Sequence, residues 1–310
     1  MSTPITPAGC RPQPARWQHG RWLALAGLLW AAHALHLDGR LNFALHNGWP
    51  QAQAQAASLA RGGYRVQVEA QSVAGVADDL SGLAYDAGRD QLWAVVNAPP
   101  ELLALDKQGA VLARYPLTGF EDVEGVAWLG GDLLLLTEER RHALVAVTVP
   151  HTPGPLVRSA QRALTLTTEA GRNHGFEGVA YDRAGDRLFV VKEHSPRRLY
   201  EVRGLRASLA GSFALEIIDR SAWIRDKIFA TDLASIEFDP RSGHLLVLSE
   251  AAKLVLELDA GGQLVASHPL ARGFAGLARS VPQAEGIALD DAGTLYLVSE
   301  PNLFYAFGRD

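Results

Sequence analysis

Acidic side chains recur at one position of this sequence, directly before a glycine. Glu124, Glu177 and Glu285 occupy that position in VEGVAWL, FEGVAYD and AEGIALD. A second acidic set ends short apolar runs such as DLLLLTE: Glu138, Glu193, Glu250 and Glu300, with Asn97 at the same place in another run. Carboxylates that gather in one place repel one another and raise one another's pKa unless a cation compensates. If the fold brings these residues together, they predict a site for a hard divalent cation.

The acidic positions belong to a repeat with a period of 43 to 57 residues. Its five copies begin LSGLAYD (80–86), VEGVAWL (123–129), FEGVAYD (176–182), LASIEFD (233–239) and AEGIALD (284–290). Each opening is followed by a turn signal and a second apolar run, which together predict a β-hairpin. A third apolar run follows in every copy, and a fourth in most. Four antiparallel strands at this period are typical of a propeller blade, so the sequence predicts an all-β, five-bladed β-propeller of four-stranded blades.

The two ends of the repeat array are predicted to complete one another. The fifth copy stops at its third strand, NLFYAF (302–307), and an unassigned strand, YRVQVEA (64–70), precedes the first copy. If the N-terminal strand joins the last blade, the ring closes without an open sheet edge. We therefore expect one propeller domain over residues 63–310, with a helix-like insertion at 219–229.

The propeller geometry places the two acidic sets on one face. The first strand of a blade lines the central channel and the second runs antiparallel beside it, so the start of one lies near the end of the other. Asp79, Asp122 and Asp232 lie just before such starts and join the same rim. The predicted ligand set is Asp79, Asp122, Glu124, Glu138, Glu177, Glu193, Asp232, Glu250, Glu285 and Glu300. Calcium accepts six to eight oxygen ligands in flexible geometry and fits this set better than magnesium.

A second interpretation of the same residues needs no ion. A repeated Glu-Gly pair can serve the blade turn, with the Glu bonded to backbone N–H groups of the next blade. The Glu residues at hairpin ends can equally be solvated strand termini. Zinc and copper sites are disfavoured, because the chain has a single cysteine, Cys10, and the candidate ligands are oxygens.

Catalysis at such a site would require a group that transfers protons. His174 and His194 are the candidates, since each lies close to a predicted ligand on the acidic face. Basic side chains near the same rim could bind an anionic substrate: Arg140, Arg141, Lys192, Arg197 and Arg198. The chain lacks a G-x-S-x-G elbow, a P-loop and a dinucleotide-binding fingerprint. A calcium-dependent hydrolase of small esters, lactones or phosphates is therefore the alternative to a binding protein.

The N-terminal segment predicts export or anchoring. Arg11, Arg16 and Arg21 precede an apolar run, Trp22–Leu37, which is short for a membrane span of ~20 residues but extends toward residue 45. The positive flank predicts a cytoplasmic N-terminus over 1–21, a membrane anchor or signal segment over 22–45 and a linker over 46–62. An uncleaved anchor is favoured over a cleaved signal and over an amphipathic helix packed on the domain.

Charge disfavours a nucleic-acid partner. The 310-residue chain holds 29 basic and 34 acidic side chains, a net charge of −5. Residues 1–40 contain four Arg and one Asp, so the remaining 270 residues carry −8. A phosphate backbone would be repelled by such a domain.

The two recurring patterns, E-G-[VI]-A-[YWL] at the openings and L-x-[VL]-[VL]-[KST]-E at the hairpin ends, resemble the SdiA-regulated family of bacterial envelope proteins. The resemblance implies a membrane anchor, a five-bladed propeller distantly related to NHL-repeat propellers and a calcium site, without an established activity. Ser81 and Ala234 stand where the other openings carry Glu, so the ring of Glu ligands that the family implies is incomplete here.

The expectation is then a calcium-binding propeller anchored in the bacterial inner membrane and facing the periplasm. It would bind an unknown small molecule or protein. A purely structural ion is a third possibility.

Overall fold

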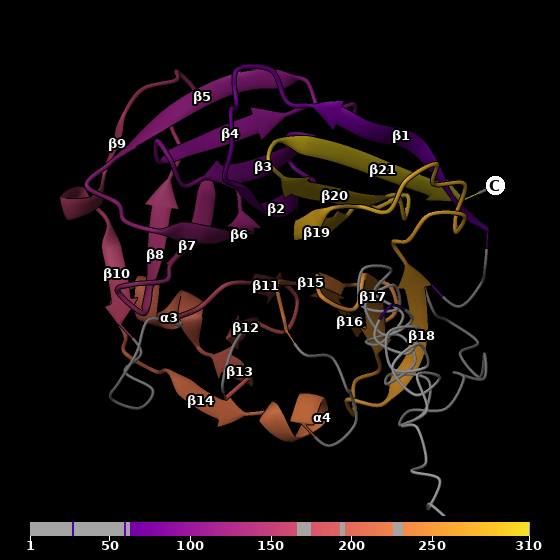
Figure 1. The fold of residues 1–310 in the computed structure, drawn as a ribbon. Helices are drawn as coiled ribbons and strands as arrows, with labels where there is room; N and C mark the ends of the chain where they lie inside the picture. The colour runs from indigo at the N-terminus through magenta and orange to yellow at the C-terminus, as the bar shows by residue number, and fades with distance from the viewer. Residues whose placement is uncertain are drawn as a thin grey trace, which may run out of the picture. The chain divides into compact units, whose positions relative to one another are not determined.

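Each copy of the repeat forms its own antiparallel sheet, as the alternation of apolar runs and turns predicts (Figure 1). The computed structural model describes residues 27, 59, 63–165, 175–192, 196–225 and 232–309. Contacts divide the chain into units 1–38 and 39–310, and the fold described here lies in the second. Apart from Gly27 and Leu59, the predicted anchor and linker lie outside the described residues. No helix in the described part is long and apolar enough to cross a membrane.

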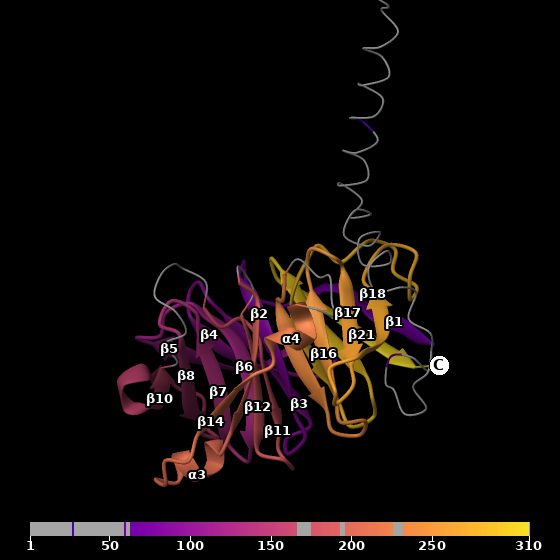
Figure 2. The same cartoon turned by 90° about the horizontal axis from the view of Figure 1, so that it is seen from below.

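Five sheets make up the ring, and Figure 2 shows the same strands from the side. The first blade contains β2 (Leu80–Asp86), β3 (Gln91–Val96), β4 (Glu101–Leu105) and β5 (Val111–Thr118). The second contains β6 (Val123–Gly130), β7 (Leu133–Glu138), β8 (Ala143–Thr148) and β10 (Arg162–Thr165). The third contains β11 (Val179–Asp182), β12 (Arg187–Lys192), β13 (Arg198–Arg203) and β14 (Glu216–Asp219). The fourth contains β15 (Ser235–Asp239), β16 (His244–Ser249), β17 (Leu254–Leu258) and β18 (Leu264–Pro269). The prediction of a five-bladed, four-stranded propeller is confirmed.

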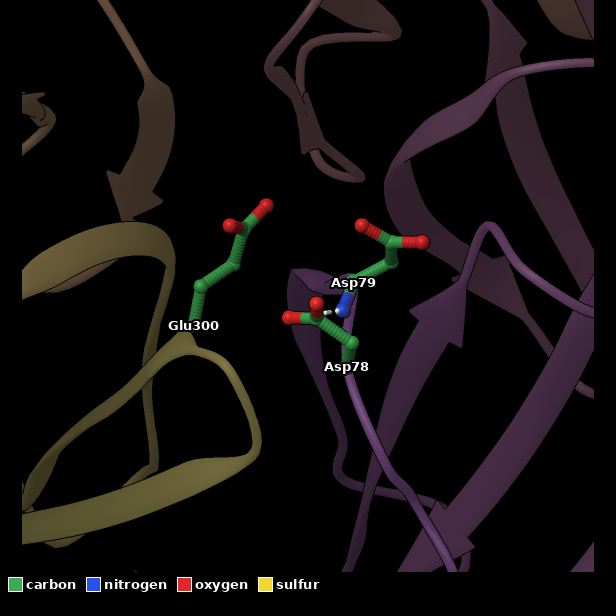
Figure 3. A group of neighbouring side chains, drawn as sticks. All are labelled: Asp78, Asp79 and Glu300. Atoms are coloured by element: carbon green, nitrogen blue, oxygen red, sulfur yellow. Dashed lines mark hydrogen bonds between the residues drawn. The ribbon is translucent and has the colours of Figure 1, made fainter.

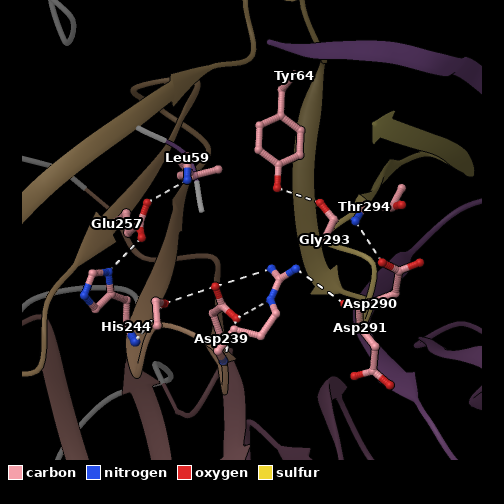
Figure 4. Close-up of polar contacts among 11 residues, drawn as sticks. Leu59, Tyr64, Asp239, His244, Glu257, Asp290, Asp291, Gly293 and Thr294 are labelled. Carbon is pink, nitrogen blue, oxygen red and sulfur yellow. Dashed lines mark hydrogen bonds and ion pairs between the residues drawn. The ribbon is translucent and has the colours of Figure 1, made fainter. Parts of the chain in front are cut away.

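The fifth blade closes the ring with the N-terminal strand, as predicted. It contains β19 (Gln283–Leu289), β20 (Leu295–Glu300), β21 (Leu303–Arg309) and β1 (Tyr64–Ser72). β1 pairs antiparallel with β21, beginning at Tyr64 opposite Arg309. The Tyr64 hydroxyl also donates to the Gly293 carbonyl oxygen at 2.7 Å (Figure 4). Chain segments more than 200 residues apart therefore form one sheet, and no blade in the ring lacks its outer strand.

A few short elements lie outside the four strands of each predicted blade. β9 (Leu156–Val157) pairs in parallel with β5 and so links the second blade to the edge of the first. It is followed by η1 (Arg158–Ala160). α3 (Leu205–Leu209) lies between β13 and β14, and α4 (Ser221–Arg225) falls in the predicted insertion. Elements of two to five residues are too short to show a periodicity, which explains why β9 and α3 were not predicted.

The core lies between blades. One apolar cluster joins the first blade to the second, with Trp93, Tyr115, Val126, Trp128 and Leu136 among its buried members. This packing also explains the glycine of the repeat. A Cβ atom on Gly125 would lie 2.4 Å from the Glu177 carbonyl oxygen, and one on Gly178 would lie 2.7 Å from the Ser235 Cα. The first strands approach so closely at Gly125 and Gly178 that a side chain there would clash with the neighbouring blade, whereas the fourth blade carries Ser235 at the equivalent position. The glycine is therefore architectural, and the question of function concerns the carboxylate beside it.

Candidate metal centre

Three carboxylates converge at the start of the second blade. Asp122, Glu124 and Glu139 each offer an oxygen within 4.8 Å of the other two. Asp122 precedes β6, Glu124 is the second residue of β6, and Glu139 follows β7. The Glu139 N–H donates to the Asp122 carbonyl oxygen at 2.8 Å, which ties the end of the second strand to the start of the first. A β-bulge at the start of β6 breaks the ladder between Val123 and Val126, where a bulge can re-aim a side chain.

The charge of this cluster is only partly compensated. The Asn97 side-chain amide donates to Asp122 at 2.8 Å and to Glu124 at 3.1 Å. Arg140, whose side chain is 64% exposed, pairs with Asp122 at 2.8 Å. Burial raises the pKa of Glu124 to about 7, and the charges of Asp122 and Glu139 add to the rise, against a hydrogen bond with Ser81. Burial and Asp122 also raise the pKa of Glu139. The cluster therefore has the charge and the oxygen donors to hold a metal ion.

A second cluster lies where the ring closes. Asp78, Asp79 and Glu300 also offer oxygens within 4.8 Å of one another. Figure 3 shows Glu300 approaching from the end of β20 and the two aspartates from the segment before β2. The Asp79 N–H is bonded to the Asp78 carboxylate at 3.0 Å. Burial raises the pKa of Glu300, and so do Asp79 and Asp78. Because the charge of Glu300 also raises the pKa of Glu124, the two clusters act on one another.

Sequence reasoning missed Asp78 and Glu139 and selected Glu138 in place of its neighbour. Glu138 is fully buried and pairs with Arg158 at 2.7 Å and Arg141 at 3.8 Å. Successive side chains along a strand point to opposite faces, so only one of two adjacent glutamates can face the cluster. The signal for Glu139 is present in the sequence, since the run DLLLLTEE ends in two glutamates.

Two other predicted ligands have protein partners. Asp232 is buried and accepts hydrogen bonds from the Ser249 hydroxyl at 2.5 Å and from the Glu250 N–H at 2.6 Å. Glu250 itself pairs with the ammonium of Lys253 at 2.5 Å. In the described part of the chain, the structure places neither residue in a cluster of potential metal ligands. The Asp232 carboxylate thus caps the turn after β16, and the Glu250 carboxylate is neutralised by Lys253.

The remaining candidates lie at the borders of the site or beyond the described residues. Glu177 forms a side-chain hydrogen bond with Glu139 and so lies beside the first cluster. Glu285 lies in β19 at a second bulge, between Ala284 and Gly286. Neither residue belongs to the two clusters found among the described residues. Glu193, His174 and His194 lie outside those residues.

The basic residues that were predicted to lie on the rim have different surroundings. Arg141 pairs with Glu121 at 2.6 Å, and Arg198 with Asp219 at 3.7 Å. Arg197 differs, because burial lowers its pKa and its Nη1 atom is buried without a hydrogen-bond partner among the described residues. The negative charge of the nearby Asp232 carboxylate partly offsets this lowering of the Arg197 pKa. Lys192 is the last residue of β12. Arg197 is therefore the rim cation best suited to an anionic ligand.

The raised pKa of Glu124 predicts an unusual pH dependence for the metal-free protein. The pKa of Glu124 is 4.5 in the unfolded chain and about 7 in the fold. The folded state therefore binds more protons than the unfolded state between these two pH values. This contribution to stability is fully present below about pH 4.5 and is lost as the pH rises through 7. We expect the melting temperature of chelator-treated protein to fall over this range relative to Glu124→Gln. A parallel pH profile in the two proteins would contradict the assigned environment of Glu124.

The fold and the acidic clusters together define a five-bladed β-propeller with a candidate cation site where neighbouring blades meet. The chain belongs to the SdiA-regulated family, whose sequence model matches residues 56–308.

Several solved structures resemble the chain at a distance. A chain of a nidogen/laminin complex is 13% identical, with 77% of this chain and 86% of that chain covered and a TM-score of 0.47. A virginiamycin B lyase from Staphylococcus aureus is 14% identical over 74% and 66%, with a TM-score of 0.42. A gluconolactonase from Xanthomonas campestris is 13% identical over 80% and 95%, with a TM-score of 0.45. These similarities are too distant to indicate a function for this chain.

Proposed function

We propose that this protein is a membrane-anchored, calcium-binding β-propeller of the bacterial envelope that acts as a binding module for a small molecule or a protein. The observation that carries the proposal is the convergence of Asp122, Glu124 and Glu139, with oxygens within 4.8 Å and with the pKa of Glu124 raised to about 7. A cation that bound there would offset both the burial of these carboxylates and their mutual repulsion, which together raise the pKa of Glu124 and Glu139.

Calcium fits the donor set best. The three side chains offer only oxygen atoms, and calcium accepts six to eight oxygens at variable angles. Three carboxylates leave coordination positions for water or for a ligand oxygen. The buried Nη1 atom of Arg197 supplies a donor for an anionic group on the same rim. The site thus favours a ligand that carries an oxygen anion.

The proposed location rests on the N-terminal sequence. The basic residues of 1–21 precede the apolar run of 22–45, an arrangement that keeps the N-terminus in the cytoplasm and carries the following domain across the inner membrane. The propeller would then face the periplasm, where calcium and exported ligands reach it directly.

The test is a calorimetric melt of the full chain in detergent, after chelation, with calcium or magnesium added back. Calcium at about 100 times its dissociation constant is expected to stabilise the protein by about 2.7 kcal/mol, or roughly 5–10 °C. Magnesium should stabilise less, and Glu124→Gln should lose most of the calcium response. The control is Glu216→Gln, an exposed residue of β14, which should respond as the unaltered protein does. The absence of any calcium response would refute the proposal.

The hydrolase alternative requires an imidazole within reach of the ion's open position. Both candidates, His174 and His194, lie outside the described residues. Calcium-dependent turnover of a small ester, lactone or phosphate ester, lost on substitution of either histidine, would establish the enzyme instead.

A further inference from the structure

A cavity of about 190 Å³ opens at the other end of the inner strands. Glu124 lies at the start of β6, whereas the cavity is lined by Trp128 near the end of that strand and by Tyr85, Tyr181 and Phe238 at the ends of β2, β11 and β15. Four blades therefore each contribute an aromatic side chain to its wall. The cavity is separate from both acidic clusters, none of whose residues lines it.

One ionisable residue departs from the repeat in this cavity. The residue two positions after the glycine of the opening, which is Ser235 in the fourth blade, is alanine in the other four blades: Ala84, Ala127, Ala180 and Ala288. In the fourth blade it is Glu237. The strand register confirms the equivalence, because Glu237 lies opposite Leu246 on the second strand, as Ala180 lies opposite Phe189. Since the fold accepts a methyl group at this position, packing does not require the carboxyl of Glu237.

The Glu237 carboxyl forms no direct ion pair with a described cation. No ion pair within 4 Å joins it to a described cation, although Arg183 lines the same cavity. The Arg183 guanidinium instead lies over the Trp128 ring, 4.1 Å from its centroid. Burial raises the pKa of Glu237 to about 8, and the adjacent charge of Asp239 adds to this, against the Phe238 N–H and Arg183. This carboxyl is costly to ionise, and no described cation pairs with it directly to stabilise its charged form.

The other charged groups around the cavity have protein partners. Lys107, Arg187 and Arg206 lie over the Tyr85, Phe238 and Tyr181 rings, at 5.4, 5.5 and 5.6 Å from the ring centroids. Asp239 is bonded to Arg241 at 3.0 Å, and Arg241 reaches the Asp291 carbonyl oxygen at 3.5 Å (Figure 4). Asp291 also lines the cavity and adds a second acidic residue to its wall. Tyr85 and Tyr181 donate to Asp90 and Asp186, and burial raises the pKa of both hydroxyls, so they stay neutral near pH 8.

We infer that this cavity binds a small organic cation, whose positive group pairs with the Glu237 carboxylate among the surrounding aromatic side chains. An ammonium group supplies the direct ion pair that Glu237 lacks, and the apolar ring atoms of Tyr85, Tyr181 and Phe238 suit its methyl or methylene groups. Asp291 at the cavity adds attraction for the same charge. The site is independent of the calcium site proposed above. It would give the protein a second binding function, at the opposite end of the inner strands.

Isothermal titration calorimetry with three probes of similar shape tests the inference on the full chain. Tetramethylammonium is cationic at every pH, tert-butanol is neutral, and pivalate is anionic. Tetramethylammonium alone should bind, with an affinity that rises about tenfold between pH 7 and pH 9 as the ionised fraction of Glu237 grows. At pH 7 its binding should release nearly one proton, measured in buffers of different ionisation enthalpy.

Substitutions at Glu237 separate this site from the fold and from the acidic clusters. Glu237→Ala restores the residue that four blades already use, so it should fold and lose both the binding and the proton release. Glu237→Gln should lose them as well, whereas Glu124→Gln should keep them. Preferential binding of pivalate, a pH-independent affinity for tetramethylammonium, or no saturable binding of any probe at millimolar concentrations would overturn the inference. Because Glu124→Gln should lose the calcium response and keep the binding of tetramethylammonium, failure of either proposal is distinguishable from failure of the other.

Discussion

Replacement of Gly125 by alanine is expected to destabilise the propeller by about 3 kcal/mol or more, the upper end of the cost of overpacking a core. The added Cβ atom would lie 2.4 Å from the Glu177 carbonyl oxygen and 2.9 Å from the Thr137 hydroxyl oxygen. That hydroxyl already accepts the Gly125 N–H at 2.6 Å and lies 3.3 Å from the Glu177 carbonyl oxygen. The clash involves backbone, so it is relieved only by moving the second and third blades apart.

Chemical denaturation of the two proteins measures this effect. Gly154→Ala is the matched control, because its new Cβ atom would meet nothing within 4 Å and its φ is not in the left-handed region. The control should stay within about 0.5 kcal/mol of the unaltered protein. If Gly125→Ala were equally stable, the close approach of the inner strands would not be the reason for glycine at this position of the repeat.

Glu138→Gln is expected to cost about 3 kcal/mol of stability and to leave the calcium response unchanged. Glu138 is fully buried, and its carboxylate faces Arg158, whose side chain is only 18% exposed, at 2.7 Å. Removal of one partner from a buried pair leaves the other charge uncompensated, which is strongly destabilising. The calcium response should persist because Glu138 is absent from both acidic clusters of the described residues.

Denaturation together with the calcium-dependent melt distinguishes the two roles of Glu138. Glu121→Gln is the control, since Glu121 pairs with Arg141 at an exposed site and its loss should change stability little. A Glu138→Gln protein that kept its stability but lost its calcium response would return Glu138 to the metal-ligand set.

The architecture of this protein could be predicted from local patterns. Strands such as β7 and β20 follow from apolar runs bounded by turn residues, and the blades follow from their repetition. The joining of β1 to β21 followed from a missing strand at one end of the array and a spare strand at the other. The parallel pair of β5 and β9 could not be foreseen, because two residues carry no period.

The acidic clusters were only partly predictable. Asp122 and Glu124 were expected to lie together, and so were Asp79 and Glu300, since strand starts and ends share a face in a hairpin. The choice between Glu138 and Glu139 was missed, because it depends on which face of β7 each side chain occupies where the strand ends. A shift of one residue reverses that choice.

The sequence by itself determined the number of blades, the closure of the ring and the presence of carboxylates at strand starts and ends, because alternation and repetition are local properties of the chain. It also shows that Glu237 replaces an alanine of the repeat. Only the tertiary structure decided which carboxylates are neutralised, as Glu138 is by Arg158 and Glu250 by Lys253, and which remain without a cation. The physical reason is that long charged side chains find partners across turns and neighbouring strands, at separations that no sequence period records.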